Sequence, residues 1–103
     1  MRTNLSDKQK RILRILLEKI AFENKKNLAK YSNVKVLGSN YTSDVYIRFD
    51  KVFVDEQSRA SEKTIYWSVS PEGKVDDNVL HTTRFQNLTY RVHFFDTLFE
   101  IEV

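Results

Sequence analysis

The sequence contains no cysteine, only two glycines and a single proline among 103 residues. Without cysteine the chain has no disulfide, no thiolate zinc site and no thiol nucleophile. Because glycine and proline interrupt regular structure, their scarcity favours long helices and strands over a disordered chain. Hydrophobic residues make up 41% of the chain and charged residues 30%. This length and composition predict one domain over residues 1–103.

Long hydrophobic runs are missing as well. The most apolar stretch, ILRILLEKIAF, is interrupted by Arg14, Glu18 and Lys19, and the preceding MRTNLSDKQKR is polar and charged. A signal peptide needs an uninterrupted apolar core, and a membrane-spanning helix needs about 20 mainly apolar residues. We therefore expect a soluble, cytoplasmic protein with no membrane partner.

Motifs for metals, nucleotides and catalysis are also absent. The carboxylates show no metal-loop spacing, and nothing in the spacing brings the two histidines, His81 and His93, together. The sequence therefore predicts a protein that is not an enzyme, with no catalytic residue, cofactor or metal. A cofactorless ribonuclease that uses histidine as acid or base and arginine on the phosphate is the second alternative.

The N-terminal third has the pattern of one long amphipathic helix. Ser6 and Gln9 have the spacing of a capping box, and the residues that follow, up to about position 31, include no glycine or proline. At 100° per residue one face collects the apolar side chains Ile12, Leu13, Leu16, Leu17 and Ile20. This pattern predicts a helix over about residues 7–31 with that face on a sheet.

A thinner apolar stripe recurs every seven residues on the other side of this helix. It consists of Ile15, Phe22 and Ala29, and basic residues surround it. Scattered surface apolarity is normal in soluble proteins, so one interpretation is that the stripe is only exposed. The other interpretation is a seam with a second copy, which would make a homodimer, or with another partner.

After the helix the hydrophobic period changes from 3.6 to 2, which predicts strands near residues 33–37, 43–54, 64–70, 84–95 and 98–103. The alternation slips around Asp50 and Lys51, which indicates a bulge or a bent strand and hence a curled sheet. The predicted fold is α+β, with the long N-terminal helix packed on one face of a curled four- to five-stranded antiparallel sheet. By element order alone it resembles the cystatin-like and NTF2-like folds, whose members include inhibitors, scaffolds and enzymes.

The segment LTYRVHFF, residues 88–95, alternates so that both of its faces carry large side chains. As a strand it would place Leu88, Tyr90, Val92 and Phe94 in the core, beside rows from the preceding strands that include Val45, Ile47 and Phe49 and then Ile65, Trp67 and Val69. The opposite, solvent-side face of the sheet would then carry Tyr46, Arg48, Tyr66, Arg91, His93 and Phe95. Aromatic rings interleaved with arginines are used by single-stranded nucleic-acid binders and by protein interfaces, and they also form ordinary cross-strand pairs.

The charge distribution favours a protein partner over a single-stranded nucleic acid. The net charge is only +3, and Glu100 and Glu102 on the last predicted strand oppose a track for a polyanion. We therefore predict a small non-enzymatic binding, adaptor or inhibitor protein that engages a protein partner through the aromatic and arginine face. Single-stranded RNA or DNA binding by the same face is the alternative. A phage or mobile-element protein that inhibits or adapts a host machine fits this size and composition.

Overall fold

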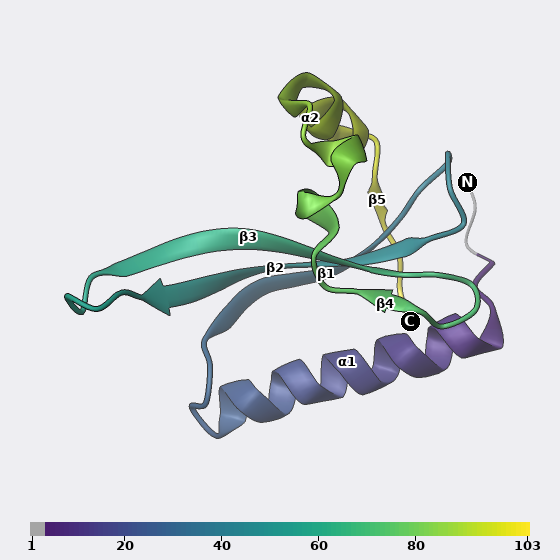
Figure 1. Ribbon diagram of the computed structural model, residues 1–103. Coiled ribbons are helices and arrows are strands. Elements are labelled where there is room, and N and C mark those ends of the chain that lie inside the picture. Colours follow the sequence, from purple (N-terminus) through teal and green to yellow (C-terminus); the bar gives the residue numbers. More distant parts are fainter. Residues whose placement is uncertain (1–3) are drawn as a thin grey trace.

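The computed structural model describes residues 4–103 and consists of one antiparallel sheet between two helical layers (Figure 1). Helix α1 covers one face of the sheet, and helix α2 lies over the other. The strand order is β4-β3-β2-β1-β5. The predicted α+β fold, with an N-terminal helix on a curled antiparallel sheet, is confirmed. The elements in chain order are α1 (Asp7–Lys25), β1 (Tyr31–Gly38), β2 (Val45–Val54), β3 (Ala60–Val69), β4 (Val75–Asp76), the 3₁₀ turns η1 (Val79–His81) and η2 (Thr83–Phe85), α2 (Leu88–Asp96) and β5 (Phe99–Glu100).

Helix α1 begins with the predicted capping box. The backbone N–H of Gln9 donates to the Ser6 hydroxyl, and the backbone N–H of Ser6 donates to the Gln9 side-chain oxygen, each over 3.0 Å. The helix ends at Lys25, earlier than predicted, because Asn27 takes a left-handed φ of 57°. The Asn24 amide then bonds both backbone groups of Tyr31, which directs the chain into β1.

The main core lies between α1 and the sheet. Phe49 of β2 is fully buried there, with the rings of Tyr31 and Trp67 packed edge-on against it. The other buried side chains of this core are Leu13, Ile20, Val36, Val45, Ile47 and Val69. The alternating rows of β2 and β3 that the sequence assigned to the core therefore do face α1. Burial of these apolar side chains is the main term that holds the helix on the sheet.

The segment LTYRVHFF is a helix, α2, so the predicted strand over residues 84–95 is wrong. The Asn87 side chain caps it by accepting from the backbone N–H of Tyr90 at 3.0 Å. A strand would put the neighbouring residues Phe94 and Phe95 on opposite faces, whereas a helix turns both toward the sheet. Of the predicted core row only Phe94 is buried, while Leu88, Tyr90 and Val92 are exposed.

A second core joins α2 to the sheet face opposite α1. Its buried members are Tyr46, Val79, Phe85 and Phe94, with Tyr66 and Phe95 packed against them among others. The neighbouring strands β2 and β3 therefore make apolar contacts on both faces of the sheet, whereas the sequence predicted that one face meets water. This layer fixes where α2 lies.

Smaller differences concern the sheet edges. Strand β3 begins at Ala60, and the β2–β3 ladder runs in register from Val45↔Val69 to Val54↔Ala60. The sequence predicted an irregularity around Asp50 and Lys51, but β2 is continuous there. The register shift lies in the paired strand β1, between Ser32 and Lys35. The predicted last strand over residues 98–103 is reduced to Phe99–Glu100. Within residues 4–103, no helix is long and apolar enough to cross a membrane.

Candidate functional site

The sheet face that the sequence assigned to solvent is covered by α2. Tyr46 is fully buried, its phenol oxygen accepts a hydrogen bond from Arg84 at 3.3 Å, and Phe94 and Phe95 pack against its ring. Tyr66 stacks on Phe95 with their ring centroids 4.0 Å apart. These three aromatic residues lie together as expected, but the prediction that their face is open is wrong, because α2 occupies it.

The two arginines of the predicted site are held by other protein groups. Arg48 forms an ion pair with Asp50 at 3.1 Å and donates to the Asn33 carbonyl at 3.0 Å. Arg91 lies on α2, where its guanidinium donates to the carbonyls of Phe85 at 2.8 Å and Leu80 at 3.3 Å. Both guanidinium groups are therefore engaged by other groups of the protein. Arg91 holds the turns η1 and η2 against α2.

Asp50 is a buried residue at the centre of a partly exposed network that ties β1, β2 and β3 together. Its carboxylate accepts hydrogen bonds from the Thr64 hydroxyl at 2.7 Å and the Asn33 amide at 2.8 Å, besides the ion pair with Arg48. These hydrogen bonds, that from Thr64 foremost, hold the pKa of Asp50 below its ordinary value. With its partners satisfied, this carboxylate acts as a structural group.

The two histidines line different pockets. His81 belongs to a hollow beside β3, together with Lys63 and Tyr66. His93 lines a separate pocket on α2. The structure therefore does not bring together the pair that a histidine acid–base mechanism requires. In the part of the chain that the structure describes, no three metal-binding side chains gather in one place.

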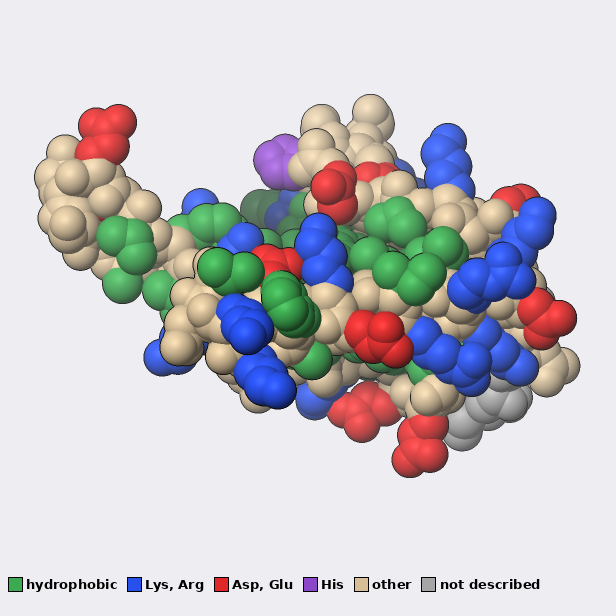
Figure 2. All heavy atoms as spheres, turned by 90° about the horizontal axis from the view of Figure 1, so that it is seen from below, with side chains coloured by type: hydrophobic (Ala, Val, Ile, Leu, Met, Phe, Trp, Pro, Cys, Tyr) green, Lys and Arg blue, Asp and Glu red, His purple; other side chains and the backbone are tan. Residues whose placement is uncertain are grey.

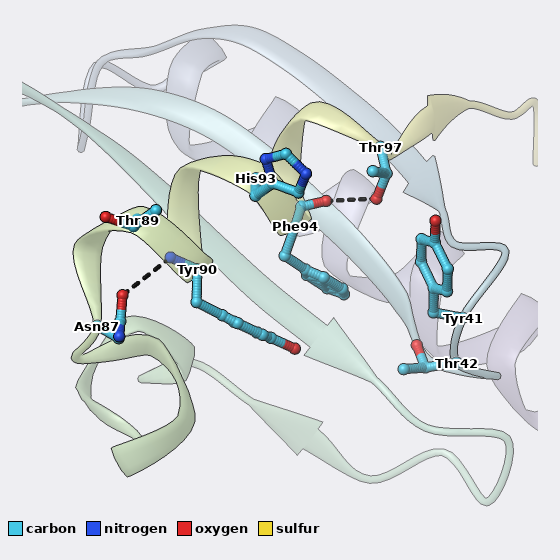
Figure 3. Close-up of a pocket in the computed structure, with 8 residues that line it drawn as sticks. All are labelled: Tyr41, Thr42, Asn87, Thr89, Tyr90, His93, Phe94 and Thr97. Carbon is cyan, nitrogen blue, oxygen red and sulfur yellow. Dashed lines mark hydrogen bonds between the residues drawn. The ribbon is translucent and has the colours of Figure 1, made fainter.

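The pocket with His93, here called the α2 pocket, has a volume of about 620 Å³ and opens between α2 and the loop that joins β1 to β2 (Figure 3). Tyr90 and Phe94 project from the helix, and Tyr41 and Thr42 face them from the loop. Its lining consists of Tyr41, Thr42, Asn87, Thr89, Tyr90, His93, Phe94 and Thr97.

Local hydrogen bonds position both walls of the α2 pocket. In the loop, the buried Ser39 hydroxyl accepts from the backbone N–H groups of Tyr41 at 3.0 Å and Thr42 at 3.3 Å. At the end of α2, the Thr97 hydroxyl donates to the Phe94 carbonyl at 2.6 Å. The ring of Tyr41 is nevertheless 74% exposed, so it forms a rim over the opening.

The chemistry of the α2 pocket is mainly apolar. Tyr90 and Phe94 supply two nearly parallel rings with centroids 6.0 Å apart. Thr42, Asn87, Thr89 and Thr97 add polar groups to this lining. An apolar wall with a few hydrogen-bonding groups suits the binding of an apolar or aromatic group.

The guanidinium of Arg84 packs on two aromatic rings, one of which, Phe94, lines the α2 pocket. The Arg84 guanidinium lies 4.3 Å from the Phe85 ring centroid and 5.2 Å from that of Phe94. Burial raises the pKa of Tyr46, and the hydrogen bond from Arg84 opposes the rise. Burial likewise raises the pKa of Asp44, again opposed by the charge of Arg84. Arg84 thus serves the packing of this region.

The apolar stripe on α1 is only partly where the sequence placed it. Ile15 and Phe22 lie on the side of α1 away from the sheet and are 53% and 54% exposed. Ala29 follows the end of the helix and lines a hollow with Tyr31 and Val52, so its predicted place on the stripe is wrong. The early end of α1 at Lys25 is the cause.

Sequence reasoning missed the α2 pocket because it treated residues 84–95 as a strand. Two signals for the helix were present. Asn87, directly before the segment, is a favoured N-cap residue, and the adjacent large residues Phe94 and Phe95 can face the same side only in a helix. Nothing in the sequence indicated Tyr41, which reaches the pocket from a loop.

Comparisons with models of protein families, with curated proteins and with solved structures found no match for this chain. The resemblance to cystatin-like and NTF2-like folds therefore stays a prediction, and the function is argued from the geometry alone.

Proposed function

We propose that this protein is a non-enzymatic binding module that holds an apolar or aromatic side chain of a protein partner in the α2 pocket. The observation that carries the proposal is the pocket itself, an opening of about 620 Å³ with rings on its wall and an exposed tyrosine on its rim. Pockets that bind ligands commonly measure about 300–1,000 Å³ and have mainly apolar walls.

The surface beside the α2 pocket supports a macromolecular occupant. Leu88 and Val92 lie one turn apart on α2 and are 65% and 60% exposed. Exposed large apolar side chains near an apolar pocket are typical of protein interaction sites, where one buried anchor supplies much of the affinity. Leu88 and Val92 lie on the other flank of α2 from Tyr90, so a partner that inserts an anchor beside Tyr90 and crosses the exposed side of α2 would also cover them.

The proposal keeps the protein partner predicted from the sequence and moves it to a different face. His93 is the one residue of the predicted binding face that lines the α2 pocket. We do not extend the proposal to single-stranded RNA or DNA on that face, because Arg48 and Arg91 are engaged with protein groups and Tyr46 is buried.

The test is selection of phage-displayed random peptides on the immobilised protein, followed by fluorescence anisotropy with the selected peptides. We expect the peptides to share one aromatic or large aliphatic anchor. Thr89→Trp, which fills the pocket from an exposed position on α2, should weaken binding at least about tenfold. Thr83→Trp, exposed on η2 outside the pocket, is the matched control.

Two results would refute the proposal. One is a selection that yields no shared anchor. The other is equal affinity of the Thr89→Trp and Thr83→Trp proteins for the selected peptides, because the occupant would then lie elsewhere. Affinity that falls steeply with salt would point to charge pairing in place of an apolar anchor.

A further inference from the structure

Helix α1 carries the whole basic excess of the protein. Residues 7–26 contain seven Lys and Arg against three Asp and Glu, a net charge of +4, whereas the full chain has 17 against 14, a net charge of +3. The rest of the chain is therefore slightly acidic. The seven cations are Lys8, Lys10, Arg11, Arg14, Lys19, Lys25 and Lys26, and all of them are exposed.

Within residues 4–103, these cations take part in no ion pair. The ion pairs found in residues 4–103 are Lys35–Glu100, Arg48–Asp50 and Arg59–Asp55, and none of them involves α1. Figure 2 looks onto this side of the molecule and shows Lys and Arg side chains gathered toward both ends of the helix, with hydrophobic side chains and several Asp and Glu side chains among them. A surface with a net positive charge attracts a partner of the opposite sign.

The same face contains an apolar centre. Ile15 and Phe22 are both more than half exposed and stand two helical turns apart, about 10 Å along the axis. Arg11 and Lys19 precede them by three or four residues on the helix surface. A small apolar centre with a charged rim is the arrangement of a protein–protein interface.

The charge of this face selects its occupant. A second copy would bring one basic helix against another, which opposes the homodimer that was one interpretation of the stripe. A nucleic-acid backbone would leave the apolar side chains of Ile15 and Phe22 uncovered. Two apolar side chains are also too few to insert a helix into a membrane surface.

We propose that the outer face of α1 docks an acidic segment of a partner protein, whose carboxylates pair with the α1 cations and whose apolar side chains cover Ile15 and Phe22. This surface is separate from the α2 pocket, because α1 and α2 lie on opposite faces of the sheet (Figure 1). The protein then has two independent binding faces, as an adaptor does.

The experiment measures fluorescence anisotropy of labelled probes with the full-length protein. The main probe is a synthetic amphipathic peptide with leucines on one helical face and glutamates elsewhere. The comparison probes are a scrambled peptide of the same composition, single- and double-stranded DNA oligonucleotides, and phosphatidylglycerol vesicles. Light scattering follows self-association in parallel.

Two pairs of variants separate the charges from the apolar centre. Arg11→Glu with Arg14→Glu reverses two α1 cations, and Lys51→Glu with Lys63→Glu makes the same charge change on the β2–β3 hairpin. Phe22→Ser removes the exposed ring, and Val54→Ser removes an exposed apolar side chain near the hairpin turn. Circular dichroism confirms that each variant is folded.

We expect the amphipathic peptide to bind more tightly than every other probe. Affinity should fall at least about tenfold in the Arg11 and Arg14 variant and in Phe22→Ser, and by less than about twofold in the two controls. Thr89→Trp should leave this binding unchanged, so failure of the α2 pocket proposal and failure of this one are distinguishable.

Each other result overturns the inference. Equal binding of the scrambled peptide, or no binding of the amphipathic one, would mean that the face does not read an acidic amphipathic segment. Tighter binding of DNA or of vesicles would assign the α1 cations to phosphate. A dimer in light scattering that Phe22→Ser dissociates would assign the face to a second copy.

Discussion

Gln9 is the residue whose replacement tests the architecture most directly. It is 2% exposed, and its side chain joins three parts of the fold. The amide oxygen accepts from the backbone N–H of Ser6 at 3.0 Å, while the amide nitrogen donates to the carbonyls of Ser43 at 2.8 Å and Val69 at 3.1 Å. Gln9→Glu keeps the shape and the first bond, but it turns a carboxylate oxygen toward the two carbonyls.

The cost follows from these contacts. Two hydrogen bonds contribute about 1 kcal/mol each, and a buried carbonyl left without a donor costs about 1–3 kcal/mol. We therefore expect Gln9→Glu to lower the free energy of unfolding by about 3–5 kcal/mol at pH 7. A domain of this kind has about 5–15 kcal/mol in total, so the loss is large.

The loss should depend on pH. In its protonated form the introduced carboxyl can donate to one of the two carbonyls, so folding raises its pKa above the unfolded value of about 4.3. The contribution of such a group is fully present below its unfolded pKa and is lost as the pH rises through its folded pKa. The difference between Gln9→Glu and the wild type should accordingly be smaller at pH 4 than at pH 7.

The assay is urea unfolding followed by the fluorescence of Trp67, the single tryptophan, whose ring packs on Phe49 in the main core. Gln86→Glu, the same change at an exposed position, is the control. If Gln9→Glu and Gln86→Glu unfold within about 0.5 kcal/mol of each other at pH 7, the bonds of the Gln9 amide contribute little and the reasoning is refuted.

Two further predictions test the sheet network and α2. Because the hydrogen bond from Thr64, foremost among several, lowers the folded pKa of Asp50, its contribution to stability is present above an unfolded pKa of about 3.9 and is lost as the pH falls through the folded value. Asp50→Asn should thus flatten the acid dependence of unfolding below about pH 4, and identical acid profiles of the two proteins would contradict the network. Asn87→Ala removes the cap of α2 and should lower the free energy of unfolding by about 1 kcal/mol in urea titrations. An unchanged urea midpoint would show that the Asn87 cap does not hold this helix.

Local signals and the fold agree over the first two thirds of the chain. Ser6 and Gln9 predicted the start of α1, and the period-two rows of β2 and β3 assigned Phe49 and Trp67 to the sheet face that α1 covers. Such signals are reliable because capping and amphipathic periodicity depend on neighbours in sequence. The end of α1 was less accurate, because it depends on the left-handed turn at Asn27 and on the contact of Asn24 with Tyr31.

The exposed side of α1 was equally readable from the sequence. The position of Ile15 and Phe22 among cations follows from helical geometry alone once the helix is known. The same geometry cannot tell what such a stripe contacts. The interaction proposed for it rests on the charge count, which the sequence contains, and on the finding that none of the ion pairs in residues 4–103 involves α1, which only the structure provides.

The sequence by itself determined the N-terminal helix, the strands β1, β2 and β3 and the side of the sheet that the helix covers, since each depends on short-range periodicity. Only the tertiary structure decided the state of residues 88–95, whose alternation suits a strand as well as a helix. The decision came from packing: as a helix, this segment places Phe94 and Phe95 together against Tyr46 and Tyr66. That choice buried the predicted binding face and created the α2 pocket, because contacts between residues far apart in sequence leave no local pattern.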